Sequence, residues 1–121
     1  METITLTIGT VVALNSGQVQ DDRREVQFTG EKLAETRHFG RDRNGNLTDA
    51  RGEDHVLYRT EDGRYVVHET EWSRWRGEPT TERLVEVSEE DLKPGGAFDL
   101  LGAEAGFGRP LTLDEALEVS P

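Results

Sequence analysis

Short runs of alternating apolar and polar residues recur along the chain, and each run is typical of a β-strand. Residues 3–14 alternate in part and predict a strand. Residues 18–31 are mostly polar, with a weaker strand candidate around Val26 and Phe28. Residues 32–39 fit a strand or a short helix, and we favour a strand because a hairpin-like context follows.

The clearest pattern is a pair of β-rich runs, residues 55–60 and 64–72, separated by Glu61-Asp62-Gly63. Asp-Gly between two such runs predicts a hairpin with a tight turn. A two-residue turn at Asp62-Gly63 would gather one set of side chains on an expected core face: Val56, Tyr58, Tyr65 and Val67. The half-exposed face would then carry His55, Leu57, Arg59, Val66, His68 and Trp72. A three-residue turn would shift the pairing by one residue and mix these sets.

Two segments flank this hairpin. Residues 40–54 are polar, contain Leu47 as their one large apolar residue, and predict a long loop. On the other side, residues 83–87 predict a further strand. Ser88 and Asp91 then form a capping-box pattern, which predicts a short helical turn that ends before Pro94.

The last part of the chain contains two short apolar pieces, residues 98–101 and 111–117. Thr112 and Glu115 form a second capping-box pattern, which predicts a short helix in the second piece. The ten acidic and three basic residues from Glu82 onward give this part a net charge of −7.

These patterns predict one domain of the α+β or mainly β class. Its centre is an antiparallel sheet of four to six strands, built around the 55–72 hairpin. We expect residues 1–95 to form the antiparallel β domain. Residues 96–121 form an acidic C-terminal segment whose short helices pack on the same domain.

Composition narrows the functional classes. The 121 residues are 33% hydrophobic and 32% charged, with a formal net charge of −11. Such a surface repels phosphate backbones and favours a basic partner over direct nucleic-acid binding. Arginine supplies twelve of the fourteen basic residues, the exceptions being Lys32 and Lys93. Coding bias, salt adaptation and a basic partner all remain open as explanations of this charge.

Other functional classes lack their sequence signals. The absence of cysteine excludes disulfides, thiolate metal sites and a thiol nucleophile. The first residues lack the basic region of a signal peptide, and no apolar run reaches the length of a membrane span. We therefore expect a cytoplasmic protein without membrane contact.

The histidines and serines match no known catalytic or metal-binding spacing. His38, His55 and His68 lie on or beside expected strands, but no two of them have the helical i, i+4 spacing of a zinc protease. No G-x-S-x-G nucleophile motif is present, and the glycine-rich pieces do not lead from a strand into a long helix. We therefore expect no catalytic residue, metal or other cofactor.

The segment Trp72-Ser73-Arg74-Trp75-Arg76 is the strongest candidate for a contact surface, because tryptophan and arginine are enriched at binding hot spots. Arg59 and His68 of the hairpin join it as candidate binding residues. The alternative is structural: Trp72 covers the core of the hairpin, and the arginines pair with the surplus carboxylates.

The central part of the chain resembles the small bacterial EXLDI proteins. The shared features are an F-x-G-x-x-L-A run at residues 28–34, and Tyr58-Arg59-Thr60 followed by Gly63-Arg64-Tyr65. The resemblance covers residues 28–75. It departs at both ends, because the N-terminal segment is not helical in pattern and no closing E-x-L-D-I is present. It implies a bacterial origin and a β-rich centre, and carries no activity.

These observations predict a non-catalytic, acidic binding module that recognises another protein with a basic surface. One alternative is an inhibitor, antitoxin or immunity-type protein that imitates the phosphates of a nucleic acid. It requires acidic side chains in rows along one face. Another is a small metal-dependent or small-molecule enzyme with a β-barrel-like pocket, which would have to be lined by His55, His68 and nearby carboxylates. Homo-oligomerisation is left open.

Overall fold

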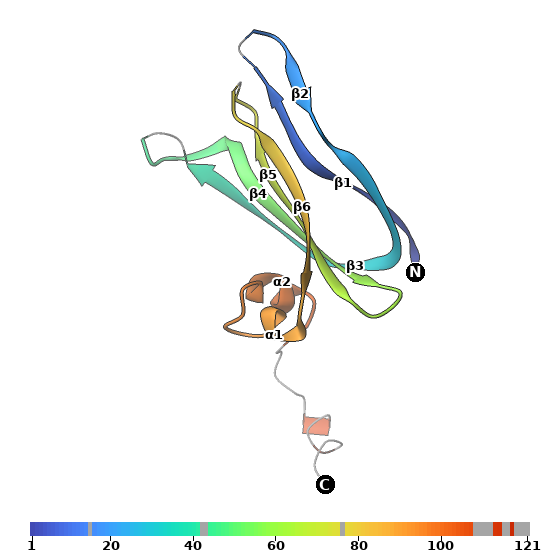
Figure 1. The fold of residues 1–121 in the computed structure, drawn as a ribbon. Coiled ribbons are helices and arrows are strands. Elements are labelled where there is room, and N and C mark those ends of the chain that lie inside the picture. The colour runs from blue at the N-terminus through green and yellow to red at the C-terminus, as the bar shows by residue number, and fades with distance from the viewer. Residues whose placement is uncertain (15, 42–43, 76, 108–112, 115–116, 118–121) are drawn as a thin grey trace.

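Six strands and two short helices follow one another in the computed structural model, which describes residues 1–14, 16–41, 44–75, 77–107, 113, 114 and 117 (Figure 1). All strand pairs are antiparallel and belong to one sheet, which confirms the predicted mainly β fold. The strands are β1 (Glu2–Ala13), β2 (Val19–Asp21), β3 (Arg24–Arg41), β4 (Leu47–Thr60), β5 (Tyr65–Ser73) and β6 (Thr80–Val87). The helices are α1 (Glu89–Leu92) and α2 (Asp99–Glu104).

The sheet closes on itself because β1 pairs with strands on both of its edges. Residues 2–8 of β1 pair with β3, whereas residues 9–11 pair with β6. The ring of neighbours is therefore β1, β3, β4, β5 and β6, with β2 pairing beside the end of β1. Closure gives the sheet an inner and an outer face, and Figure 1 shows β3 bending sharply to make it possible.

The turn between β4 and β5 contains three residues, so the predicted two-residue turn is wrong. The Thr60 N–H donates to the Arg64 carbonyl oxygen at 2.8 Å, and the Gly63 N–H donates to the Thr60 carbonyl oxygen at 3.0 Å. Gly63 has a φ of 87°, as expected for the left-handed residue that ends a three-residue hairpin loop. The Asp62 carboxylate accepts hydrogen bonds from the Thr60 hydroxyl and the Arg64 guanidinium, which stabilise this longer turn.

The longer turn changes which side chains share a face. Leu57 lies opposite Val67, and Tyr58 lies opposite Val66. The expected core face is therefore split between the two faces of the sheet. The inner face receives Val56, Tyr58, Val66, His68 and Trp72, and the outer face receives His55, Leu57, Arg59, Tyr65 and Val67.

Each face has its own apolar core. On the outer face Leu57 and Val67 are completely buried, and the two helices cover them with Leu92 and Leu101. Inside the ring a second cluster joins side chains from five strands: Ile4, Leu6, Phe28, Val56, Tyr58, Val66 and Leu84. Burial of one such side chain contributes about 1.5–3 kcal/mol.

The predicted long polar loop over residues 40–54 is also wrong. β3 continues to Arg41 and β4 begins at Leu47, so the connection is only five residues long. Because β4 lies between β3 and β5, its backbone groups can form hydrogen bonds on both sides whatever its side chains are. The first half of β4 therefore needs no alternating apolar residues, and the apolar pattern predicted a strand only from residue 55 onward.

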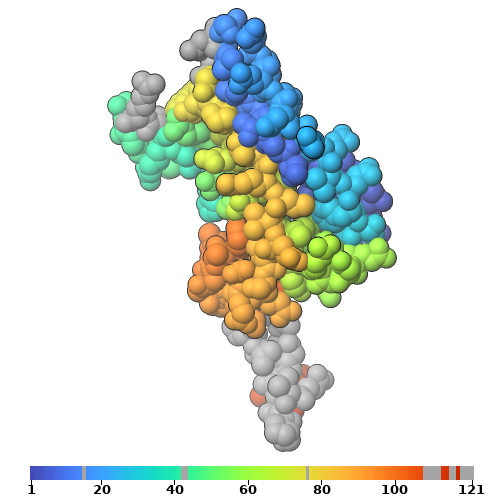
Figure 2. All heavy atoms as spheres, in the orientation of Figure 1, coloured from blue at the N-terminus to red at the C-terminus, as the bar shows by residue number. Residues whose placement is uncertain are grey.

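The helices cover only one end of the sheet, as Figure 2 shows. Ser88 caps α1 with the reciprocal Asp91 hydrogen bonds of a capping box, which confirms that prediction. Thr112 and Glu115, the second predicted capping pair, lie outside the described residues. No helix in the described part of the chain is long and apolar enough to cross a membrane.

Candidate functional site

The uncovered end of the sheet carries an aromatic and arginine cluster on its inner face. Strand pairing aligns Phe39 of β3, Gly52 of β4 and Trp72 of β5 in one row. Arg37 and Asp54 form the next aligned pair on the same face. Together with Arg74, which follows β5, these six residues are named the platform.

Gly52 provides the space in which the indole of Trp72 lies. A Cβ atom at this position would come within 2.7 Å of the Trp72 ring and 2.5 Å of the His38 carbonyl oxygen. The indole therefore reaches across β4 and meets the ring of Phe39 edge-on, with centroids 6.2 Å apart. This geometry is favourable for two aromatic rings.

Charged groups surround the same indole. Its Nε1–H donates to Asp54 at 3.3 Å, and Asp54 also accepts two hydrogen bonds from Arg37 at 2.9 and 3.1 Å. The hydrogen bond with Asp54 raises the pKa of the Arg37 guanidinium. The guanidinium carbons of Arg37 and Arg74 lie 5.9 and 5.5 Å from the Trp72 ring, within cation–π range.

Trp75, the other tryptophan predicted to bind a partner, contacts a different arginine through the face of its ring. The Arg51 guanidinium carbon lies 4.2 Å from its ring centroid, and Arg51 pairs with Glu78 at 2.5 Å. The structure thus brings Trp72 and Arg74 together and gives Trp75 separate partners. Arg76, also predicted, lies outside the described residues.

The other two predicted binding residues lie elsewhere. Arg59 is at the opposite end of the hairpin, with its guanidinium 6.0 Å from the Tyr65 ring. His68 lies on the inner face, where its Nε2 is 2.8 Å from the Thr7 carbonyl oxygen and 3.4 Å from a carboxylate oxygen of Glu82. These contacts link β5 to β1 and β6.

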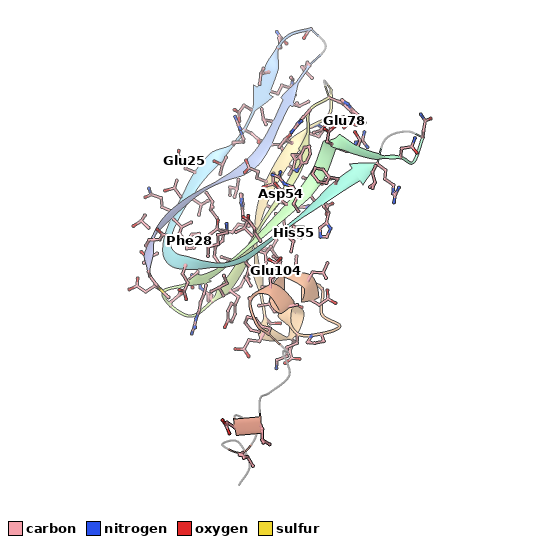
Figure 3. All side chains as sticks on the ribbon, turned by 180° about the vertical axis from the view of Figure 1, so that it is seen from behind. Glu25, Phe28, Asp54, His55, Glu78 and Glu104 are labelled. Carbon is pink, nitrogen blue, oxygen red and sulfur yellow. The ribbon has the colours of Figure 1, made fainter. Side chains whose placement is uncertain are left out.

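His55 and His68 do not line a common pocket, because pairing places them on opposite faces of the sheet. Figure 3 labels His55 and its neighbour Asp54 on β4. Because consecutive side chains of a strand point to opposite faces, Asp54 lies on the inner face and His55 on the outer face. Within the described part of the chain, no group of three or more histidine and carboxylate side chains is arranged to hold a metal ion.

His55 instead lines a cavity of about 270 Å³ on the outer face, between β4, β5, β6 and the segment before α2. This space is named the outer cavity, and three carboxylates reach it: Glu53, Glu69 and Glu71. Phe98 forms one wall, with its ring centroid 5.8 Å from that of His55. Arg83 also lines the cavity, and its guanidinium lies 3.5 Å from a carboxylate oxygen of Glu69.

Sequence reasoning missed four residues of the platform, and of the outer cavity it anticipated only that His55 and nearby carboxylates would line a pocket. Arg37, Phe39, Gly52 and Asp54 lie far from Trp72 in sequence, and only the register of β3, β4 and β5 brings them beside it. Gly52 was the one available signal, since a glycine inside a strand often marks a close approach. Because the residues around Gly52 are polar, the sequence predicted a loop there and not the first half of β4.

Comparisons with family models, curated proteins and solved structures gave no match to this chain. The resemblance to the EXLDI proteins therefore stays a prediction, and the functional argument rests on the geometry of the sheet.

Proposed function

We propose that this protein is a non-catalytic binding module that recognises another protein through the platform. The observation that carries the proposal is the position of Trp72, which is held on Gly52 at the end of the sheet without a helical cover. A large aromatic ring fixed in one orientation loses little conformational freedom on binding. Such rings are enriched at the centres of protein interfaces.

The exposure of its neighbours supports this role. Phe39 is 51% exposed although it contacts Trp72, and Arg74 is exposed beside the same ring. An apolar side chain and a guanidinium at the rim of a rigid indole offer both buried area and directional donors to a partner. The platform is therefore a better contact surface than either tryptophan alone.

The charge of the protein favours a partner with a basic surface. The net charge of −11 attracts such a partner over a distance set by the ionic strength. Arg37 of the platform is paired with Asp54, and Arg51 close to the platform is paired with Glu78, so these two arginines add little net positive charge there. Electrostatic steering mainly raises the association rate.

The alternative of a nucleic-acid mimic is less well supported. It requires rows of carboxylates along one face, whereas Glu53, Glu69 and Glu71 of the outer face form a cluster with Arg83 beside it. We therefore prefer recognition of a protein surface to blocking of a nucleic-acid channel.

Affinity capture from the native host, followed by measurement with the purified partner, tests the proposal. The double variant Phe39→Ser/Arg74→Glu should lose the partner, because it removes exposed platform groups and leaves the buried cores intact. The control Leu47→Ser/Arg24→Glu changes one exposed apolar residue and one exposed arginine outside the platform and should retain the partner. Equal retention by both variants would contradict the proposal.

A further inference from the structure

The pairing between β1 and β6 is short, although both strands continue beyond it. Residues 9–11 of β1 pair with residues 80–82 of β6. In the same register residues 5–8 would pair with residues 83–86, but these pairs do not form, although the structure describes all of these residues. Gly9 has a φ of 117°, outside the range of a regular strand, and beyond it the two strands separate (Figure 1). The closed sheet therefore has an opening between the first half of β1 and the second half of β6.

The first half of β1 presents unpaired backbone groups to this opening. The Thr29 carbonyl oxygen, opposite Thr3 on β3, accepts instead from an N–H of the turn between β4 and β5 at 2.8 Å. The Thr7 carbonyl oxygen lies 2.8 Å from Nε2 of His68, on the side away from β3. Because backbone groups alternate along a strand, Thr3, Thr5 and Thr7 all direct their N–H and C=O groups away from β3. Within the described part of the chain no strand pairs with these three threonines on that side, and they are named the free edge.

The free edge lacks the features that normally prevent a strand from pairing with another chain. Unpaired edges usually carry a lysine, a proline or an inward-pointing charge. Residues 3–20 contain no charged side chain and no proline, although 32% of the whole chain is charged. Thr3 and Thr5 are exposed, and β-branched side chains favour extended neighbours. The free edge is therefore open to a further strand.

The apolar core beside the opening is incompletely sealed. The buried side chains of the inner core, Ile4, Leu6, Tyr58 and Val66, are each 8% or 9% exposed, whereas the largest fully buried side chains all belong to the outer core. Ile4 and Leu6 alternate with the threonines of the free edge and point into the ring. A strand added beside β1 would place alternate side chains next to them and complete the inner core.

The charges around the opening determine which kind of strand fits. The strand segments beside it, residues 2–8, 24–30 and 82–87, contain four acidic and two basic residues. One of the two basic residues, Arg83, already contacts Glu69. A second copy of this chain would bring a further net charge of −11 and an edge without basic residues. A strand with lysine or arginine at alternate positions complements these surroundings better.

We infer that the free edge binds an extended segment of a basic protein by strand addition. The backbone groups of Thr3 and Thr5 form hydrogen bonds with the segment. Its apolar side chains contact Ile4 and Leu6, and its basic side chains, at the alternate positions, point outward. This inference deepens the proposed function and rests on it in one respect: the segment belongs to the basic partner.

Amide hydrogen exchange, measured by NMR, tests the inference with the peptide acetyl-Thr-Val-Lys-Val-Lys-Val-Thr-amide as the probe. The amides of Thr3 and Thr5 should exchange rapidly in the free protein, and saturating peptide should slow them at least about tenfold. The amide of Ile4, which pairs with β3, should exchange slowly in both states. Absence of saturable binding, or unchanged exchange at Thr3 and Thr5, would overturn the inference.

Two N-methylated forms of the peptide test for backbone hydrogen bonds. One form is methylated on the valine amides and the other on the lysine amides, so each loses donors along one edge only. Because only one edge of an added strand faces β1, one form should bind like the parent peptide and the other at least about tenfold more weakly. Equal affinities of the two forms would rule out strand addition.

The variant Thr5→Pro removes one donor of the free edge and should bind the peptide at least about tenfold more weakly. Proline is tolerated on a strand edge whose N–H is unpaired, so the melting temperature should stay close to that of wild type. The matched control is Val19→Pro on the exposed strand β2, away from the opening, and it should bind like wild type. Wild-type affinity of Thr5→Pro would overturn the inference, and so would its unfolding, since the Thr5 N–H would then be paired in the native fold.

Two further measurements identify the occupant. Sedimentation equilibrium should show a monomer, and a dimer with protected Thr3 and Thr5 amides before any peptide is added would assign the free edge to a second copy and overturn the inference. A peptide with glutamate in place of lysine should bind at least about tenfold more weakly at low ionic strength, where charge is least screened. Equal affinity would reject a basic segment.

The outcomes for the free edge and for the platform are distinguishable. If the peptide fails to bind while the variant Phe39→Ser/Arg74→Glu still loses the captured partner, strand addition is wrong and the proposed function stands. If the peptide protects the free edge while that variant retains the partner, the platform is wrong and strand addition stands.

Discussion

The two ends of this sheet are stabilised by different kinds of interaction. At the end covered by the helices, aliphatic side chains such as Leu57, Val67 and Leu101 are almost completely buried. At the platform end, Trp72 is only partly buried and is held by a ring contact, two guanidinium groups and a hydrogen bond to Asp54. The covered end provides most of the apolar burial, whereas the platform end keeps large side chains accessible.

The difference shows how a small acidic chain can remain folded while it presents an aromatic surface. Non-directional burial at one end fixes the strands, and their register then sets the positions of the platform residues at the other end. A substitution in the covered core should therefore cost more stability than one at the platform, and a surface ion pair should cost least.

The largest effect is expected for Leu101→Ala. Leu101 is 1% exposed, so its truncation leaves a cavity and should lower the free energy of unfolding by about 2–5 kcal/mol. The neighbouring Leu100 is 60% exposed, and Leu100→Ala should change the same quantity by less than about 0.5 kcal/mol. Urea denaturation measures both. Equal effects would show that the helices do not complete the outer core.

Gly52→Ala tests the platform end. The added methyl group would collide with the Trp72 ring and the His38 carbonyl oxygen, so we expect a loss of about 1–3 kcal/mol. The tryptophan fluorescence of the native state should change at the same time, because the indole must move. Wild-type stability and fluorescence would contradict the described position of Trp72.

Gly63→Val tests the turn that sets the register between β4 and β5 and so affects both ends of the sheet. Gly63 has a φ of 87°, which a β-branched residue resists, so the variant should lose more than about 1 kcal/mol of unfolding free energy. Gly63→Asn is the matched control, since asparagine tolerates this conformation and should lose less. Thermal denaturation compares the two variants, and identical melting curves would reject the left-handed turn.

The smallest effect concerns an exposed ion pair on the β2 side. Hydrogen bonds from Arg23 lower the pKa of Asp21 from 3.8 to about 2. A carboxyl group with a lowered pKa in the folded state adds stability above its unfolded pKa, and this is lost as the pH falls from about 4 to about 2. Because the pair is exposed, the change in stability should be minor.

NMR titration of the Asp21 carboxyl carbon measures this pKa directly. In an Arg23→Gln variant the pKa should rise towards 3.8, since the charged hydrogen bonds are gone. An unchanged pKa in that variant would show that Arg23 is not the cause.

Much of the fold follows from local sequence. The alternation of Ile4 and Leu6, the Asp-Gly turn after residue 60 and the Ser88 capping box each act over a few residues, and each predicted the element that the structure contains. The tryptophan and arginine segment was also visible, although its role stays a proposal. Local propensities can be read from sequence because they depend on near neighbours.

The sequence by itself determined a mainly β antiparallel fold, an acidic charge and a hairpin with aromatic residues. Only the tertiary structure decided the closure of β1 on β6, the register that places Phe39 and Asp54 beside Trp72, and the outer cavity around Glu69. The physical reason is that side chains alternate between the two faces of a strand, so one extra turn residue moves every side chain of one hairpin strand to the other face relative to its partner strand. Contacts between distant strands depend on that register and have no local signature.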